Sequence, residues 1–304
     1  MGRRIAVTGA SGFIGGHLVT HLAARGDAVI RVQRPFQGEP LAAAFRGVDA
    51  VVHLAGVITA PREQDYVEGN AAATRIVAEA SRETGVHLVY VSSLAAAGPA
   101  PPSAPRREED PPAPLTAYGR SKLAGERAVA DQSRLSWTVL RPGVVYGPRD
   151  RALLPLFRLS RRGVLPVVGR RTAAYTFGYV DDVVSAIVAA TRGDSPGETF
   201  FVGHRQPVTA RALIEGIRVA TRGRAVVVPI PRPIVRLAAW VGDAAGSVRG
   251  STVLIDSRRY DEVYAEGFVC CVDRLRDRLG VEAQVALDEG LRQTAQWYRS
   301  QGWA

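Results

Sequence analysis

The sequence predicts an α/β fold in which a doubly wound parallel sheet is followed by a smaller C-terminal cap. Short apolar strands alternate with helical patterns over residues 4–140, which is typical of βαβ units. A glycine-rich turn at residues 8–15 separates the first strand from the first helix. Beyond Gly147 the alternation loosens, and we therefore expect a second, smaller unit there.

The order of apolar and turn residues predicts each element. Strands are expected at 4–8, 28–32, 50–54, 88–92, 137–140 and 199–202. Helices are expected at 13–24, 70–84, 116–130, 151–162, 180–190, 234–245 and 287–301. The Pro-rich segment 98–114 predicts a loop that can act as a lid, and residues 33–45 leave too little room for the usual third strand.

Composition narrows the class of protein. The 304 residues are 46% hydrophobic and carry a net charge of +10, but the arginines look scattered and no nucleic-acid motif accompanies them, so no nucleic-acid partner is expected. No apolar run is long enough to predict a membrane span or a signal segment. Adjacent Cys270 and Cys271 lack the spacing of a zinc site, so no metal site is expected. We expect a cytoplasmic protein without a membrane partner.

The turn after the first strand has the glycine spacing of a phosphate-binding loop. Gly9 permits the tight turn, Gly12 lets the backbone approach a pyrophosphate, and Gly15 allows close packing of helix on strand. The helix N-terminus then offers free N–H groups to the phosphate. The turn predicts a Rossmann-type NAD(P)-binding domain over residues 1–146, to which elements 176–203 return. Residues 147–304 are then a substrate-binding cap with a closing helix. Six residues of the turn are expected to bind the cofactor: Gly9, Ser11, Gly12, Phe13, Ile14 and Gly15.

The end of the second strand indicates which dinucleotide binds. A carboxylate there would bind the ribose 2′-OH of NAD, whereas an arginine accommodates the 2′-phosphate of NADP. The strand ends on Arg34 without an acidic residue. NADP is therefore favoured, and NAD remains possible.

Tyr118 and Lys122 lie four residues apart in a predicted helix, hence on one face. Lys122 is the only lysine of the chain, which suggests a need for a compact ammonium. Such a charge would lower the pKa of a tyrosine that acts as an acid–base catalyst. Ser93, at the end of a strand, can hold a carbonyl or alcohol oxygen.

Together these motifs resemble the extended branch of the short-chain dehydrogenase/reductase superfamily, the NAD-dependent epimerase/dehydratase-like enzymes. The matching pieces are TGASGFIG (8–15), HLAG (53–56), Asn70 in NAAATR, VSS (91–93), YGRSK (118–122), LRPGVVYGPRD (140–150), FGYVDDV (177–183) and the closing segment 287–303. They cover nearly the whole chain.

The resemblance implies a role for each matching position. Tyr118 would be the acid–base, Lys122 would lower its pKa and bind the nicotinamide ribose, and Ser93 would orient the reacting oxygen. Asn70, the fourth catalytic residue, would help to position the helix or a proton-relay water. Two further segments would line the cofactor: Leu54, Ala55 and Gly56, and Pro142, Gly143 and Val144. The resemblance also implies a homodimer formed through the Tyr118 helix. We expect His53 to be a packing residue, and Asp181 and Asp182 to cap their helix.

Departures from the family pattern favour some activities over others. Leu94 and Ala95 follow Ser93 where dehydratases carry acidic residues, which disfavours a dehydratase. Tyr175 stands where nucleotide-sugar enzymes often place an arginine for the substrate diphosphate. The expected substrate-lining residues are mostly apolar, which predicts a hydrophobic or aromatic carbonyl substrate. They are Val57, Leu94, Tyr146, Arg149 and Tyr175.

Three functions fit the sequence. The favoured one is an NAD(P)-dependent alcohol dehydrogenase or carbonyl reductase that uses Tyr118 as the acid–base. The second is an NAD-dependent epimerase of (nucleotide-)sugars that recycles its bound NAD with the same residues. The third is a nucleotide-binding structural or regulatory protein, which the retained Tyr118–Lys122 pair disfavours.

Overall fold

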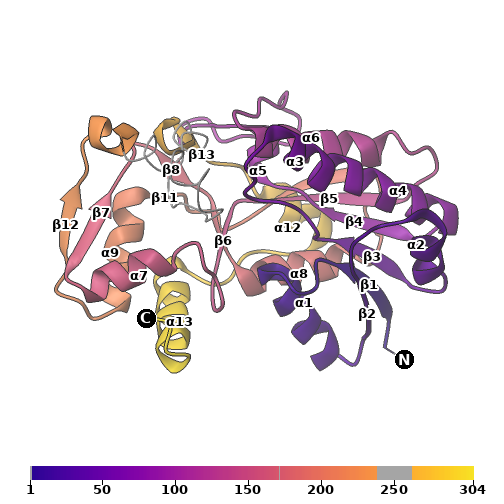
Figure 1. Cartoon of the computed structure of the whole chain (residues 1–304), viewed down its shortest axis with the longest axis horizontal. Coiled ribbons are helices and arrows are strands. Elements are labelled where there is room, and N and C mark those ends of the chain that lie inside the picture. The colour runs from indigo at the N-terminus through magenta and orange to yellow at the C-terminus, as the bar shows by residue number, and fades with distance from the viewer. Residues whose placement is uncertain (1, 171, 238–261) are drawn as a thin grey trace.

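The computed structural model describes residues 2–170, 172–237 and 262–304. A large sheet with helices on both faces forms one part of the molecule, and the cap forms the other (Figure 1). The α/β class with a doubly wound parallel sheet is confirmed.

The central sheet has six strands in the order β10-β5-β4-β3-β1-β2, and all neighbours are parallel. Every residue of β3 and β4 is buried, as expected for parallel strands covered on both faces. The strands are β1 (Arg4–Thr8), β2 (Ala28–Val32), β3 (Ala50–His53), β4 (His87–Val91), β5 (Trp137–Pro142) and β10 (Glu198–Val202).

Alternation of side chains along β1 divides the core into two layers. Ile5 and Val7 join the cluster under α1 (Phe13–Ala24) and α8 (Val180–Ala190), whereas Ala6 joins the cluster on the opposite face. Three helices cover that opposite face: α2 (Gly38–Phe45), α4 (Ala73–Thr84) and α6 (Ala117–Ala130).

Residues 33–49, between β2 and β3, contain no strand, in agreement with the expectation that residues 33–45 leave too little room for one. They contain α2, and they carry the chain from the edge strand β2 to β3 on the other side of β1. Leu41, Ala42 and Phe45 bury the inner face of this helix, which the sequence analysis missed. The helix expected at 70–84 begins at Ala73 and follows α3 (Glu63–Tyr66) and a π-helical turn, η1 (Val67–Ala72).

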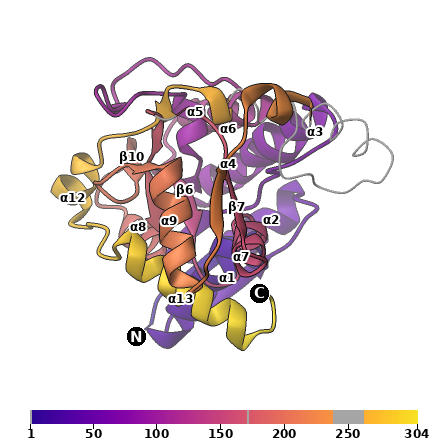
Figure 2. The same cartoon turned by 90° about the vertical axis from the view of Figure 1, so that its left-hand side faces the viewer.

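The cap packs two helices against a two-stranded ribbon, and a third helix packs on one of these two. The helices are α7 (Leu154–Arg161), α9 (Ala210–Ala220) and α13 (Leu287–Ser300), and the parallel ribbon pairs β7 (Val164–Val167) with β12 (Val226–Pro229). Figure 2 views these elements from the cap end. Phe157, Ile217 and Tyr298 are fully buried at the centre of the cap. Of the helix expected at 234–245, residues 234–237 are helical and 238–245 lie outside the described residues.

Short strands connect the cap with the large sheet. β6 (Val144–Tyr146) pairs with β9 (Phe177–Tyr179), and β8 (Ala174–Tyr175) lies between β11 (Val208–Thr209) and β13 (Gly267–Phe268). From β9 the chain continues through α8 to β10, which extends the large sheet.

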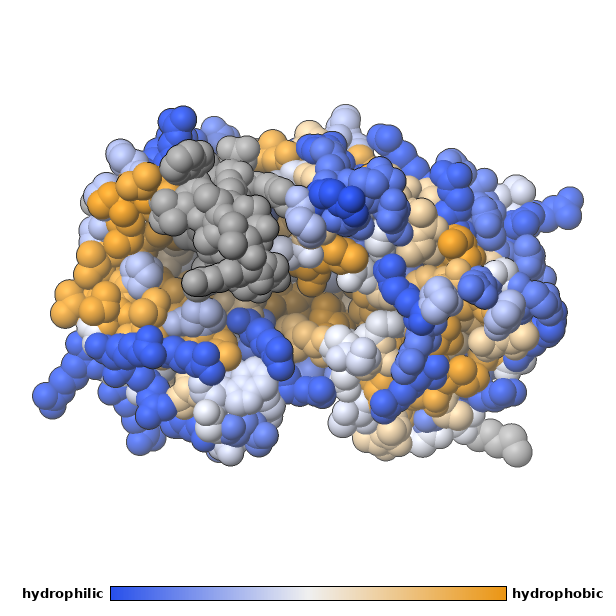
Figure 3. Space-filling view, in the orientation of Figure 1, coloured by the Kyte–Doolittle hydropathy of each residue, from blue (hydrophilic) through white to orange (hydrophobic). Residues whose placement is uncertain are grey.

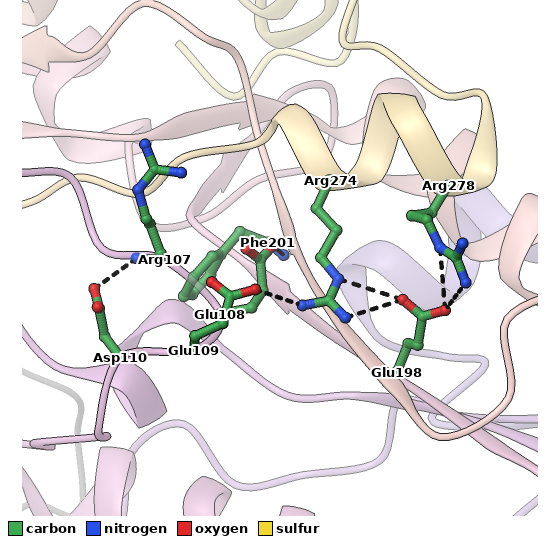
Figure 4. Close-up of polar contacts among 8 residues, drawn as sticks. All are labelled: Arg107, Glu108, Glu109, Asp110, Glu198, Phe201, Arg274 and Arg278. Atoms are coloured by element: carbon green, nitrogen blue, oxygen red, sulfur yellow. Dashed lines mark hydrogen bonds and ion pairs between the residues drawn. The ribbon is translucent and has the colours of Figure 1, made fainter.

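The Pro-rich segment 98–114 contains no long helix or strand, as expected, and it is bonded to neighbouring segments. Its backbone bonds to Gly267, Val269 and Cys271. The Glu108 carboxylate accepts a hydrogen bond from the Phe201 backbone at 3.0 Å, and Glu109 pairs with Arg274 of α12 (Asp273–Leu279), as Figure 4 shows. These contacts hold the loop against β10 in this structure, and its role as a lid stays a prediction.

Asp181 and Asp182 do not cap α8 with their side chains. The Asp182 carboxylate instead accepts hydrogen bonds from the backbone of Gln284 and Val285 at 3.0 and 3.1 Å, and Asp181 lies 3.4 Å from the His17 ring. Asp182 therefore fixes the chain that leads into α13. Among the described residues, no helix is long and apolar enough to cross a membrane.

Candidate active site

The glycine turn brings backbone rather than side chains to the end of β1. Gly9 has φ of +71°, and a Cβ on it would lie 2.7 Å from the Ala55 nitrogen. A Cβ on Gly15 would lie 2.1 Å from the Gly9 carbonyl oxygen. Both positions therefore exclude residues larger than glycine. A turn without side chains at these positions would let a pyrophosphate approach the backbone closely.

The first turn of α1 is suited to an anion. Its N-cap, Gly12, supplies no side-chain cap, and its first turn contains no acidic residue, so its N–H groups and the positive end of the helix dipole are available. The Arg149 guanidinium lies beside this turn, since its Nη1 would be 2.8 Å from a Cβ on Gly16. Arg149, expected to contact substrate, is thus placed against the phosphate-binding helix.

Asn70 fixes the loop that follows β3. Its Oδ1 accepts a hydrogen bond from the Val57 nitrogen at 2.7 Å, and its Nδ2 donates to the Val57 carbonyl at 3.0 Å. Nδ2 also donates to Ser121 Oγ at 2.8 Å, and that hydroxyl donates to the Tyr118 carbonyl. Through Val57, which directly follows the predicted cofactor residues 54–56, Asn70 therefore joins this loop to the helix of the predicted catalytic pair.

The positions of Ser93 and Tyr118 depend on a close approach of two helices. Ser93 is the N-cap of the short α5 (Leu94–Ala97), and its Oγ accepts a hydrogen bond from Ala95 N at 3.2 Å. A Cβ on Gly119 would lie 2.4 Å from the Ala95 carbonyl oxygen. Gly119 thus lets α6 touch α5, which brings Tyr118 and Ser93 to the same edge of the sheet. The Tyr118 ring also meets Tyr66, at a centroid distance of 6.4 Å.

Lys122 is buried one turn beyond Tyr118. Only 4% of the residue is exposed, its Nζ donates to the Val91 carbonyl at 2.7 Å, and it lies 4.5 Å from the centre of the Tyr90 ring. Burial lowers the pKa of Lys122 to about 7, although the Glu126 carboxylate opposes this shift. Burial, rather than a neighbouring charge, is therefore the main influence on the pKa of this ammonium.

A buried polar network behind Lys122 was missed by the sequence analysis. Arg141 forms a two-point ion pair with Glu126, at 2.9 and 2.6 Å, and Ser92 Oγ donates to the same carboxylate at 2.5 Å. Both side chains of the ion pair are more than 90% buried. The spacing of Lys122 and Glu126, four residues apart on one helix, is the signal that could have found it.

His53 is a packing residue, as expected. It is fully buried, its Nδ1 lies 2.7 Å from Thr8 Oγ1, and its Nε2 lies 3.1 Å from Thr74 Oγ1. Burial, followed by the charges of Lys122 and Arg34, lowers its pKa well below the ordinary value. The ring is therefore neutral and links β1 to β3 and α4.

The other predicted cofactor residues lie at strand ends of the same sheet. Arg34 follows β2, and its guanidinium donates to the Gly69 carbonyl at 2.5 Å and lies over the Phe36 ring. Pro142 ends β5, and a Cβ on Gly143 would lie 2.2 Å from the Thr176 carbonyl oxygen. Val144, the first residue of β6, is exposed.

The structure brings together only some of the predicted substrate residues. Leu94 and Tyr175 meet in one apolar cluster with Phe268, whose ring stacks on Tyr175 at 6.5 Å. Tyr146 instead lies in the cap core and is 1% exposed. Figure 3 shows the surface hollowed between the large sheet and the cap.

Comparisons with known proteins agree with this geometry. Residues 5–203 match the model of the NAD dependent epimerase/dehydratase family. The chain is 29% identical to a ceramide reductase of Caulobacter vibrioides, over 98% of this chain and 95% of that protein. It is 27% identical to a UDP-glucose 4-epimerase of Mycolicibacterium smegmatis, over 98% and 99% of the two chains. The structure of MoeE5 in complex with UDP-glucose and NAD superposes with a TM-score of 0.79 at 25% identity, over 98% and 99% of the chains.

Proposed function

The chain belongs to the NAD-dependent epimerase/dehydratase family and is an enzyme of the extended short-chain dehydrogenase/reductase type, and we propose that it is an alcohol dehydrogenase or carbonyl reductase. The observation that carries this proposal is the arrangement of Tyr118 and Lys122 on one helix, which Gly119 brings against the helix capped by Ser93. Bound NAD(P) would supply or accept a hydride at nicotinamide C4.

The chain's own residues would manage the proton and the orientation of the substrate. Ser93 Oγ would hold the reacting oxygen, and Tyr118 would donate a proton to it during reduction or remove one during oxidation. The Lys122 ammonium would stabilise the phenolate of Tyr118. Both polar atoms of the Asn70 side chain are hydrogen-bonded, so Asn70 would fix the position of the cofactor loop relative to α6.

The surroundings of Ser93 favour reduction of a carbonyl over elimination. Leu94 is buried and Ala95 carries no ionisable group, so no acid or base follows Ser93 as a dehydratase would require. Leu94, Tyr175 and Phe268 form an apolar wall. We propose a hydrophobic carbonyl substrate, in keeping with the similarity to a ceramide reductase.

Two arginines would hold the phosphates of the cofactor. Arg34, at the end of β2, would leave the Gly69 carbonyl to pair with the 2′-phosphate of NADP. Arg149 would pair with the pyrophosphate over the first turn of α1. Without an anion between them, the positive charge of Arg149 would repel the positive end of the helix dipole. NADP is the proposed cofactor, and NAD the alternative.

An epimerase is the second candidate function. The similarity to a UDP-glucose 4-epimerase and to MoeE5 with UDP-glucose and NAD favours it. Tyr175 disfavours an epimerase of nucleotide sugars, because an uncharged phenol cannot neutralise the negative charge of a substrate diphosphate.

The state of the cofactor distinguishes the two candidates. The purified protein would be denatured and any released nucleotide identified by mass spectrometry, after which the emptied protein would be titrated with NADPH and NADH. A reductase that exchanges its cofactor should release little nucleotide and turn over carbonyl compounds. Near-stoichiometric NAD⁺ would overturn the reductase and support the epimerase.

A further inference from the structure

The net positive charge of the protein is concentrated in the cap. Residues 151–180 contain six arginines and residues 216–237 contain five, and neither segment contains an aspartate or glutamate. The other 28 basic residues of the chain are balanced by its 29 acidic residues. The arginines are scattered along the chain, as expected, but the net charge is not, because these two segments lack the acidic residues that balance the arginines elsewhere.

An apolar surface lies among these arginines. The register of the ribbon pairs Val226 with Val164, and both are exposed, at 64% and 47%. Their neighbours Val227 and Leu165 turn inward to the cap core. The outer face of the ribbon is thus aliphatic, although side chains exposed to water in a strand are usually polar.

The chain after β12 extends the same surface. Ile234 and Leu237, three residues apart in the short helical segment 232–237, are 56% and 62% exposed. We call the set the apolar ribbon face: Val164, Pro166, Val226, Val228, Ile234 and Leu237. Figure 3 shows hydrophobic surface at this end of the molecule, where Figure 1 places β7 and β12.

Arginines border the apolar ribbon face without carboxylate partners. Within the described part of the chain, Arg162, Arg222, Arg224 and Arg236 form no ion pair. Where the two strands begin, a groove of about 370 Å³ is lined by arginines over an apolar floor. Its lining includes Arg161, Arg222, Arg299, Phe157 and Tyr298.

From this combination we propose that the apolar ribbon face docks the enzyme on an anionic phospholipid surface. The aliphatic side chains would enter the boundary between headgroups and acyl chains, while the arginines pair with lipid phosphates. Such binding needs no membrane-spanning helix, so it is compatible with the absence of a span among the described helices.

Charge and side-chain type favour this partner over two others. A nucleic acid would gain little from exposed Val, Ile and Leu, because bases stack on aromatic and guanidinium planes. A second copy would bring its own unpaired arginines to the same interface, where like charges repel. An anionic lipid surface satisfies both the arginines and the aliphatic side chains.

Vesicle flotation with the full chain tests the proposal. The protein should float with phosphatidylcholine vesicles that contain phosphatidylglycerol, float far less with phosphatidylcholine alone, and be released by salt. The double variant Ile234→Ser/Leu237→Ser should lower vesicle affinity about tenfold. Arg222→Glu/Arg224→Glu should lower it by at least about fivefold per arginine.

A matched pair of exposed arginines on α4 serves as the control. Arg75→Glu/Arg82→Glu changes the net charge equally and should leave vesicle binding within about twofold of the parent. Thermal unfolding and NADPH binding verify that each variant is folded, which separates this result from any failure of the reductase proposal.

Three results would overturn the docking proposal. The first is no binding to anionic vesicles at low salt, and the second is binding that the Ile234→Ser/Leu237→Ser variant leaves unchanged. The third is tighter binding of duplex DNA or of a second copy by the same residues, measured by fluorescence anisotropy and by sedimentation.

Discussion

In the proposed mechanism, proton transfer depends on a single phenol, that of Tyr118. Tyr118→Phe removes the group that would donate or accept the proton and leaves the ring contact with Tyr66 in place. We expect turnover of a carbonyl substrate to fall at least about 100-fold, with NADPH affinity nearly unchanged. Steady-state kinetics and fluorescence titration measure both, and substantial residual turnover would contradict the proposed mechanism.

Lys122 couples the site to pH through its burial. The folded-state pKa is about 7, against 10.5 for the ordinary side chain. Between these values the unfolded chain binds one more proton than the folded protein, so stability rises with pH across this window. Lys122→Met should therefore raise the melting temperature most at pH 6, and the gain should shrink by pH 9. A gain independent of pH would contradict the assigned titration.

Arg34 is the residue that we propose selects NADP over NAD. Arg34→Ala should weaken NADPH binding about 10- to 100-fold, because it removes a charge-assisted contact to the 2′-phosphate. NADH binding should change by less than about twofold. Arg31→Ala, which removes an exposed arginine of β2 three residues before Arg34, is the matched control. Equal losses for both nucleotides would refute the assignment.

At the scale of elements, close approaches position the site. A Cβ on Gly119 would lie 2.4 Å from the Ala95 carbonyl, whereas one on Gly38 would meet open space. Gly119→Ala should push α6 from α5, lower the free energy of unfolding by about 1–3 kcal/mol and reduce kcat. Gly38→Ala should do neither. Chemical denaturation and kinetics measure the two variants, and a fully active Gly119→Ala protein would show that the contact is not needed.

At the scale of the whole molecule, nucleotide binding should stabilise the fold. A ligand present at about 100 times its Kd adds about 2.7 kcal/mol to the free energy of unfolding. NADPH should therefore raise the melting temperature of the parent. Gly15→Ala should abolish this rise, since its Cβ would lie 2.1 Å from the Gly9 carbonyl. A rise that persists in a folded Gly15→Ala protein would place the nucleotide elsewhere.

The sequence by itself determined the parallel sheet, the glycine turn and the helical pair of Tyr118 and Lys122. These features are local, because strand periodicity, turn chemistry and the four-residue spacing on a helix each depend on only a few neighbouring residues. The sequence also showed the missing strand after β2, but not that α2 fills the segment, because its short apolar face is defined only by the sheet beneath it.

Only the tertiary structure decided which distant residues meet. It tied the Pro-rich loop to β10 through Glu108 and Arg274, placed the Arg149 guanidinium beside the α1 turn, and buried Tyr146 in the cap core. It also joined Glu126 to Arg141 behind Lys122, and gathered the arginines and exposed aliphatic residues of two separate segments on one end of the cap. Such contacts follow from packing between segments far apart in the chain, for which a single sequence carries no periodic signal.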